Sequence, residues 1–276
     1  MGLIKITLEV KMKKSFTQAL FVFLVLFTTA INAQQPNIEV REKAAIVAGE
    51  VTPAGSNLCH TFNGAPQVSI STEGNILLFQ GANQGDHIYN EGYALCNTGS
   101  PVRYSTNIFG DTGFGPASCS CAGNTCTVTR NTSDGRMRLT QELTKPAGLD
   151  RSFNIKMTVK NLTGAGINNV VLRRLATVDI NSAISEWHES TRDSSSGWGT
   201  KADGIPYAVR LRHITRSPAS ITYEAKTPVF ADLTCNPADQ TVNGPQFGDF
   251  DSTVQYGLGT LGPSATKTVT VQYLRD

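Results

Sequence analysis

The sequence has few charged residues, very little tryptophan or methionine, and no long apolar run after its first 33 residues. Charged residues make up 17% of the chain, with two tryptophans and four methionines. A membrane-spanning helix needs about 20 consecutive apolar residues, so residues 34–276 are not expected to span a membrane. Neither an HExxH zinc-protease motif nor a G-x-S-x-G nucleophile motif occurs. The sequence therefore lacks the signatures of two common hydrolase classes.

No excess of positive charge remains once the first 33 residues are set aside. The whole chain carries 24 Lys and Arg against 22 Asp and Glu. Removing the four lysines and one glutamate of residues 1–33 leaves 20 positive against 21 negative side chains, a net charge of −1. A nucleic-acid-binding domain usually presents a clear basic surface. Nucleic acid is therefore not an expected partner.

The beginning of the chain has the order of a secretory signal peptide. Met12 precedes Lys13 and Lys14, an apolar run follows at residues 19–27, and small residues end at Ala33. A positive segment, a short apolar segment and a small residue at the cleavage point are typical of such leaders. We predict a signal peptide over residues 1–33, with Met12 as the natural start. One domain over residues 34–276 would then be secreted, to the extracellular space or the periplasm.

Six cysteines follow the leader, which favours an oxidising compartment. They are Cys59, Cys96, Cys119, Cys121, Cys126 and Cys235. Turn residues separate Cys121 from Cys126, so a disulfide that closes a hairpin is expected there. The other four would then pair as Cys59–Cys96 and Cys119–Cys235, one choice among the 15 that six cysteines allow.

A metal site is the alternative for part of this cysteine set. Cys119, Cys121 and Cys126, with His60 as a further ligand, have the donor types that zinc prefers. This alternative requires reduced thiolates, which export to an oxidising compartment disfavours.

Alternation of apolar and polar residues is the strongest structural signal in the chain. Over residues 153–159 every second side chain is apolar, the period of a strand with one buried face. Residues 137–143 alternate likewise, and residues 167–180 are rich in β-branched residues, so both faces of that strand are expected to be covered. Short turns separate the three segments, which predicts an antiparallel meander. Further short strands and the lack of a long helix predict an all-β fold, an antiparallel β-sandwich.

Two C-terminal segments resemble those of known proteins. They are KMTVKNLTGAGINNVVLRRLATVDI, residues 156–180, and YGLGTLGPSATKTVTVQY, residues 256–273. The first resembles a strand end followed by an N-V-x-L-x-R strand in secreted bacterial β-sandwich proteins, and the second resembles their closing hairpin. Some of those proteins belong to the supersandwich, galactose-mutarotase-like class. The resemblance covers about the C-terminal half and implies the fold only, because no sugar-epimerising His/Glu pair is found.

Residues 181–205 hold both tryptophans of the chain and read as a long loop, which in a compact domain is often functional. Flat aromatic rings next to carboxylates suit carbohydrate, because the rings cover the C–H face of a sugar and the carboxylates accept its hydroxyls. The expected ligand-binding residues are Trp187, His188, Glu189, Asp193 and Trp198. The alternative is that the loop folds back and the tryptophan rings plug one end of the sandwich.

Acidic residues in and before this loop raise two further hypotheses. Asp179 and Glu186, with Glu189 and Asp193, offer oxygen ligands for Ca²⁺, although their spacing matches no EF-hand. No other cofactor is expected. Glu186 or Glu189 with Asp193 or Asp203 also offers the two carboxylates of a glycoside-processing enzyme.

The sequence therefore predicts a secreted module without catalytic activity, which binds carbohydrate through residues 181–205. Its expected partner is a polysaccharide or another surface protein. The alternatives are a carbohydrate-active enzyme with its acids in the same loop, and a self-associating surface or matrix protein.

Overall fold

The computed structural model describes residues 57–81, 85–97, 103–148, 151–180, 186–200, 206–214, 220–228 and 244–275. The chain divides into units of residues 1–45 and 46–276, and every described residue lies in the second. Eighteen β-strands form three antiparallel sheets in these ranges, which confirms the all-β prediction. The described residues contain no helix long and apolar enough to span a membrane. The predicted signal peptide lies outside the described residues and stays a prediction.

The largest sheet has nine strands. They are β7 (Phe114–Ala122), β8 (Thr125–Thr132), β9 (Met137–Thr144), β10 (Ser152–Asn161), β12 (Glu186–Ser190), β13 (Ser194–Thr200), β14 (Pro206–His213), β16 (Gln246–Gly248) and β18 (Thr266–Arg275). Their order across the sheet is β16-β12-β13-β14-β18-β10-β9-β8-β7. Strands β8, β9 and β10 alternate buried and exposed side chains, so one face of this sheet is apolar and the other polar.

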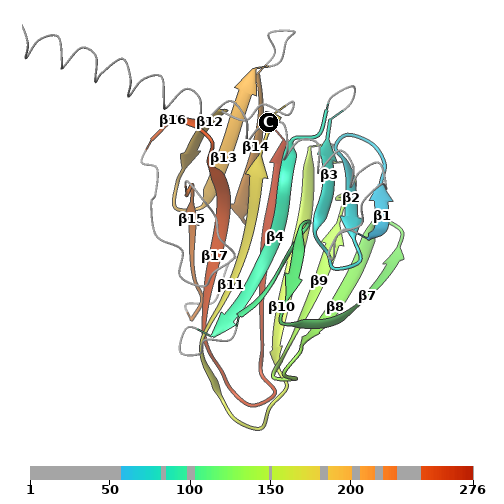
Figure 1. Ribbon diagram of the computed structural model, residues 1–276, viewed down its shortest axis with the longest axis vertical. Helices are drawn as coiled ribbons and strands as arrows, with labels where there is room; N and C mark the ends of the chain where they lie inside the picture. Colours follow the sequence, from blue (N-terminus) through green and yellow to red (C-terminus); the bar gives the residue numbers. More distant parts are fainter. Residues whose placement is uncertain are drawn as a thin grey trace, which may run out of the picture. The chain divides into compact units, whose positions relative to one another are not determined.

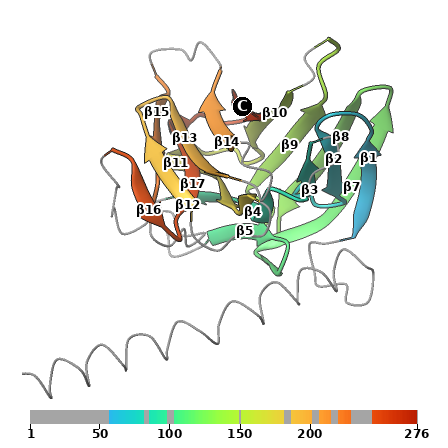
Figure 2. The same ribbon diagram turned by 90° about the horizontal axis from the view of Figure 1, so that it is seen from above.

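Two smaller sheets complete the fold. The six-stranded sheet contains β4 (Ile88–Asn97), β5 (Arg103–Asn107), β6 (Gly110–Thr112), β11 (Ile167–Val178), β15 (Thr222–Lys226) and β17 (Asp251–Leu261). The three-stranded sheet contains β1 (Leu58–Phe62), β2 (Gln67–Ser71) and β3 (Ile76–Gln80). Figure 1 shows β17, β11 and β4 side by side, and β3 next to β4. Figure 2 shows that β3, β2 and β1 follow β4 one after another.

The apolar core lies between the nine-stranded sheet and the two smaller ones. Buried apolar side chains from all three sheets form one cluster. Phe62 of β1 packs edge-on against Phe153 of β10, with ring centroids 5.2 Å apart, and Phe79 of β3 lies 6.1 Å from Tyr273 of β18. The three-stranded and six-stranded sheets therefore both cover the apolar face of the nine-stranded sheet. This arrangement makes the fold a β-sandwich.

Two pairs of consecutive strands that the sequence predicts as neighbours in one sheet lie in different sheets. β10 pairs with β9 and β18, whereas β11 pairs with β17 and β4. The predicted three-strand meander over residues 136–180 is therefore wrong for its last strand. The predicted closing hairpin of residues 256–273 is also wrong, because β17 and β18 belong to different sheets. The buried Asn161 side chain joins the two crossings by donating to the carbonyls of Ala165, Leu261 and Gly262.

The disulfides agree with the predicted hairpin bridge but not with the other pairings. Cys121 is bonded to Cys126 across the β7–β8 hairpin, as predicted. Cys59 is bonded to Cys119, so the predicted pairs Cys59–Cys96 and Cys119–Cys235 are wrong. Strand β1 contacts β7, which sequence spacing does not reveal. Cys96 is also disulfide-bonded, and Cys235 lies outside the described residues. The disulfides suit an oxidising, extracellular-type environment.

Candidate functional site

The segment that the sequence predicts as a long loop contains a β-hairpin. Residues 186–190 and 194–200 form β12 and β13, which pair antiparallel at the edge of the nine-stranded sheet. Thr191 closes the turn: its hydroxyl accepts the backbone N–H groups of Asp193 and Ser194. The prediction of an irregular loop over residues 181–205 is therefore wrong for these two strands. Residues 181–185 and 201–205 lie outside the described residues.

The outer face of this hairpin carries a row of aromatic side chains. Trp187 of β12 stands opposite Trp198 of β13 on one side and opposite Phe247 of β16 on the other. The Trp187 and Phe247 rings meet edge-on, with centroids 5.7 Å apart. Neighbouring strands are about 4.8 Å apart, so the row extends over roughly 10 Å. Figure 1 shows the three strands that carry it at one side of the fold.

The aromatic row is accessible to solvent. Phe247 is 61% exposed, Trp187 is 45% exposed and Trp198 is half-buried. Neither tryptophan is in the core, so the alternative in which the rings plug the sandwich is wrong. Because an exposed apolar patch marks a binding surface more often than an isolated exposed side chain does, we take this row as the candidate site.

Polar side chains flank the row on the same face. Glu189 of β12 stands opposite Ser196 of β13, which in turn stands opposite Arg210 of β14. On β12 and β13, the two strands that the rows share, each polar residue lies two positions from an aromatic one. The face thus combines flat apolar rings with a carboxylate acceptor and a guanidinium donor.

The inner face of β12 holds two ionisable side chains that are almost fully buried, Glu186 and His188. Burial, with the nearby Asp179 and Asp249 carboxylates, raises the pKa of Glu186 to about 9. One carboxyl oxygen accepts the backbone N–H of Ile180, and the other has no hydrogen-bond partner among the described residues. Burial lowers the pKa of His188 to about 4. Both side chains are therefore uncharged near neutral pH.

Two glycines of β13 face these inner side chains, and only one of them is needed to make room for them. A Cβ at Gly197 would lie 2.8 Å from Cε1 of His188 and 2.9 Å from a methyl group of Val178. A Cβ at Gly199 would meet Glu186 at an ordinary contact distance of 3.8 Å. The glycine at position 197 of β13 is therefore required by the space that His188 takes.

The structure brings together only part of the predicted ligand-binding set. Trp187, Glu189 and Trp198 share the outer face, whereas His188 points to the opposite face because it alternates with Trp187 along β12. Asp193 lies in the exposed turn between the two strands. Phe247 was missed, since a single phenylalanine in a glycine-containing segment carries no strand signal.

The predicted calcium ligands do not form a compact cluster in the described part of the chain. Glu186 and Asp179 are close enough to affect one another electrostatically. They belong to no group of three or more potential ligands among the described residues. A Glu186 that holds its proton is also a poor ligand for a hard cation. Calcium binding at these residues stays a prediction, and the burial of Glu186 opposes it.

Comparison with known proteins shows a similar fold at low sequence identity. No protein-family profile matches the sequence, and no curated protein matches it. The fold is similar to part of a bacterial glucoamylase solved in complex with acarbose, with a TM-score of 0.53 and 9% identity over 82% of this chain. The chain spans 32% of that glucoamylase chain. A heparinase III matches with a TM-score of 0.30 and 8% identity, over 58% of this chain and 21% of its own.

Proposed function

We propose that this chain is a secreted, non-catalytic module that binds carbohydrate through the outer face of β16, β12 and β13. The observation that carries the proposal is the cross-strand row of Phe247, Trp187 and Trp198. Aromatic rings held side by side by the ladder present flat surfaces to the C–H faces of a sugar chain. The Glu189 carboxylate and Arg210 guanidinium of the adjacent row offer an acceptor and a donor for hydroxyl groups.

The dimensions of the row favour an extended sugar chain over a protein partner. A stable protein interface buries about 800 Å² on each partner, whereas three side chains in single file form a narrow strip. The strip is also rigid, because each aromatic residue lies in a hydrogen-bonded strand. A rigid site loses little conformational entropy when it binds a ligand.

Two broader observations support a secreted carbohydrate-related protein. The disulfides suit an oxidising compartment, as expected after a signal peptide. The fold is similar to part of a bacterial glucoamylase, an enzyme solved with the carbohydrate-like inhibitor acarbose. At 9% identity this likeness concerns the fold alone, so the ligand must be argued from the residues of the row.

Isothermal titration calorimetry against soluble neutral and acidic polysaccharides tests the proposal. We expect saturable binding to one glycan class, and at least about fivefold weaker binding for Trp187→Ala, because truncating a central contact residue costs more than about 1 kcal/mol. Leu58→Ala is the matched control, since Leu58 is 62% exposed but lies in β1. Equal affinities of Trp187→Ala and the wild type for the bound glycan would contradict the proposal, as would no binding in the panel.

One observation favours the enzymatic alternative. Glu186 keeps its proton near neutral pH, as a general acid in glycoside hydrolysis must. Its side chain faces the interior and is 2% exposed, whereas Asp193 lies in the solvent-exposed turn. Asp203 lies outside the described residues. Release of reducing sugar by the wild type, abolished in Glu186→Gln, would favour catalysis over binding.

A further inference from the structure

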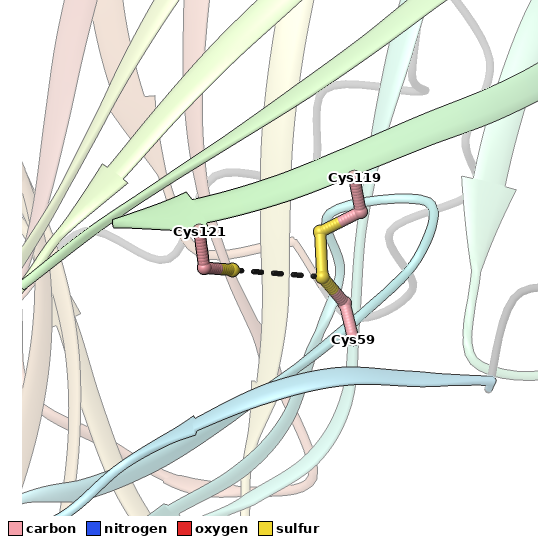
Figure 3. A group of neighbouring side chains, drawn as sticks. All are labelled: Cys59, Cys119 and Cys121. Carbon is pink, nitrogen blue, oxygen red and sulfur yellow. Dashed lines mark hydrogen bonds between the residues drawn. A yellow bond between two sulfur atoms is a disulfide. The ribbon is translucent and has the colours of Figure 1, made fainter. Parts of the chain in front are cut away.

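The outer face of the nine-stranded sheet continues beyond the aromatic row. The pairing registers from β12 to β8 contain no shift, so alternate residues of each strand keep to one face. Figure 3 shows the disulfide between Cys59 and Cys119, which ties β1 to the edge strand β7. Cys119 stands opposite the buried Val128, so β1 is held on the inner side. The outer face therefore runs without interruption from Trp187 on β12 to Ser120 on β7.

This outer face is positively charged, although residues 34–276 together carry a net charge of −1. In the described strands it holds five cations against two carboxylates, a net charge of +3. The cations are Arg138, Lys156, Lys160, Arg210 and Arg212, and the carboxylates are Glu142 and Glu189. The excess of positive charge thus lies on the same face as the aromatic row.

Two of these cations, Arg138 of β9 and Lys160 of β10, stand directly opposite one another. Like charges at opposed positions of a ladder are destabilising. Lys160 is exposed, and Nε of Arg138 donates to Oδ1 of Asn131 at 2.9 Å. Within the described ranges no ion pair joins either cation to a carboxylate. An anion bound between the two side chains, here called the β9–β10 site, would remove their repulsion.

The second pair of cations, Arg210 and Arg212, lies next to the aromatic row and is here called the β14 site. The two arginines are two residues apart on β14, so both project from the outer face. Arg210 is a diagonal neighbour of Trp198, and such neighbours are about 7–8 Å apart. Nε of Arg212 donates to Oε1 of Gln272 at 2.7 Å, which orients the guanidinium. A guanidinium held in this way suits a carboxylate, which it binds through two parallel hydrogen bonds.

Polar side chains connect the two sites. Thr158 and Thr268 lie between them on β10 and β18, with their hydroxyl oxygens 2.9 Å apart. Lys156 also lies on this path and is 2.8 Å from the Glu142 carboxylate, with both side chains nearly half exposed. Because an exposed ion pair contributes little to stability, an anionic ligand can replace Glu142 as the partner of Lys156.

We propose that the carbohydrate bound by the aromatic row is an acidic polysaccharide, whose carboxylates bind the β14 site and the β9–β10 site. This inference rests on the proposed function, since the aromatic row supplies the contacts to the sugar rings. Arg212 and Lys160 are two strands and six residues apart in the ladder, about 22 Å. A polymer that repeats an acidic sugar can reach both sites with one chain, whereas a single sugar reaches only one of them.

Matched pairs of glycans test this proposal. Polygalacturonate, alginate and hyaluronate are titrated into the full mature protein beside their carboxyl-reduced, neutral forms, and binding is measured by isothermal titration calorimetry. We expect one of the acidic polymers to bind at least about tenfold more tightly than its neutral form, because charge-assisted hydrogen bonds are about twice as strong as neutral ones. Added salt should weaken this binding by screening the exposed charges. Equal or tighter binding of the neutral forms would overturn the proposal.

Variants separate the cationic sites from the aromatic row. Arg212→Gln and Lys160→Gln should each weaken binding of the acidic polymer at least about fivefold. Arg103→Gln is the matched control and should bind as the wild type does, because Arg103 is exposed but lies on β5 of the six-stranded sheet.

The outcomes distinguish this inference from the proposed function. Unchanged affinity in both Arg212→Gln and Lys160→Gln would overturn the inference, and weaker binding in Trp187→Ala would then leave the aromatic row as the site. An equal loss in Arg103→Gln would show unspecific attraction to positive charge and would also overturn the inference. No binding of any glycan, acidic or neutral, would overturn the proposed function together with it.

Discussion

Arg174 of β11 and Glu91 of β4 form an ion pair in which both side chains are fully buried, with Nε of Arg174 2.5 Å from Oε1 of Glu91. The pair connects all three sheets. Arg174 also donates to Gln141 of the nine-stranded sheet, and Glu91 accepts the backbone N–H of Ile76 in the three-stranded sheet. The hydroxyl of Tyr273 donates to Oε1 of Glu91, the oxygen that also accepts from Arg174. Every layer of the sandwich therefore depends on this one polar cluster in its core.

Breaking this pair on one side should destabilise the protein strongly. Arg174→Met leaves the Glu91 carboxylate buried without its cation, and such changes cost about 3–5 kcal/mol. Glu91→Leu should cost a similar amount. The double variant should be less destabilised than the sum of the two, because neither buried charge is left unpaired. Urea unfolding measures all three, and simple additivity would contradict the proposed coupling.

The space around Gly197 should be more restrictive than that around Gly199. Gly197→Ala places a methyl group against His188 and Val178 at less than 3 Å, so we expect a loss of about 1–3 kcal/mol from overpacking. Gly199→Ala meets its nearest neighbour at 3.4 Å and is the matched control on the same strand. Thermal unfolding compares the two, and equal midpoints would contradict the placement of His188 beneath β13.

Stability should decrease with rising pH because of Glu186. The group has a pKa of about 9 in the folded protein, raised from an ordinary 4.5 mainly by burial. Below pH 4.5 the carboxyl group is protonated in both the folded and the unfolded state, so the free energy of unfolding is at its full value with respect to this group. Between pH 4.5 and 9 only the unfolded chain loses the proton, so the free energy of unfolding falls by up to about 1.4 kcal/mol per pH unit.

Urea unfolding between pH 5 and 9 tests this dependence. Glu186→Gln removes the ionisable group and should flatten the profile, so that the variant gains most over the wild type near pH 9. Glu189→Gln, on the outer face of the same strand, should leave the slope unchanged. An alkaline slope that survives in Glu186→Gln would show that another group causes it.

The two bridges should differ in their effect on stability. The Cys59–Cys119 disulfide spans 60 residues and the Cys121–Cys126 disulfide spans 5. Loop-closure entropy assigns about 4 kcal/mol to the first and about 2 kcal/mol to the second. Cys59→Ser/Cys119→Ser should therefore unfold at lower urea than Cys121→Ser/Cys126→Ser. The reverse order would mean that native packing, rather than chain entropy, dominates.

The sequence predicts the positions of single strands better than it predicts which strands pair with one another. Alternation located strands β9 and β10, because it records which face of a strand is buried, and β-branched residues located β11. Neither signal contains information on which strand lies alongside, so the crossing after Asn161 could not be distinguished from a hairpin. The partner of Asn161 is a turn 100 residues away, beyond the reach of any local pattern.

The sequence and the structure draw attention to the same segment as a candidate site, for partly different reasons. The tryptophans marked it, but β13 is rich in serine and glycine, residues that usually indicate a loop. The structure explains Gly197 by the bulk of His188 behind the strand, and Ser195 by its hydrogen bond to the Thr227 hydroxyl. The exposed position of Phe247 follows from pairing of β16 with β12, which depends on the fold as a whole.

Tryptophan fluorescence tests the central proposal most directly. The chain has only two tryptophans, Trp187 and Trp198, and both lie in the aromatic row. Emission of the mature protein therefore reports on this row alone. We predict a saturable change in emission on titration with one class of polysaccharide, retained in Leu58→Ala and weakened in Phe247→Ala. Calorimetric binding of that polysaccharide with no change in emission would contradict the account, because the ligand would then bind elsewhere.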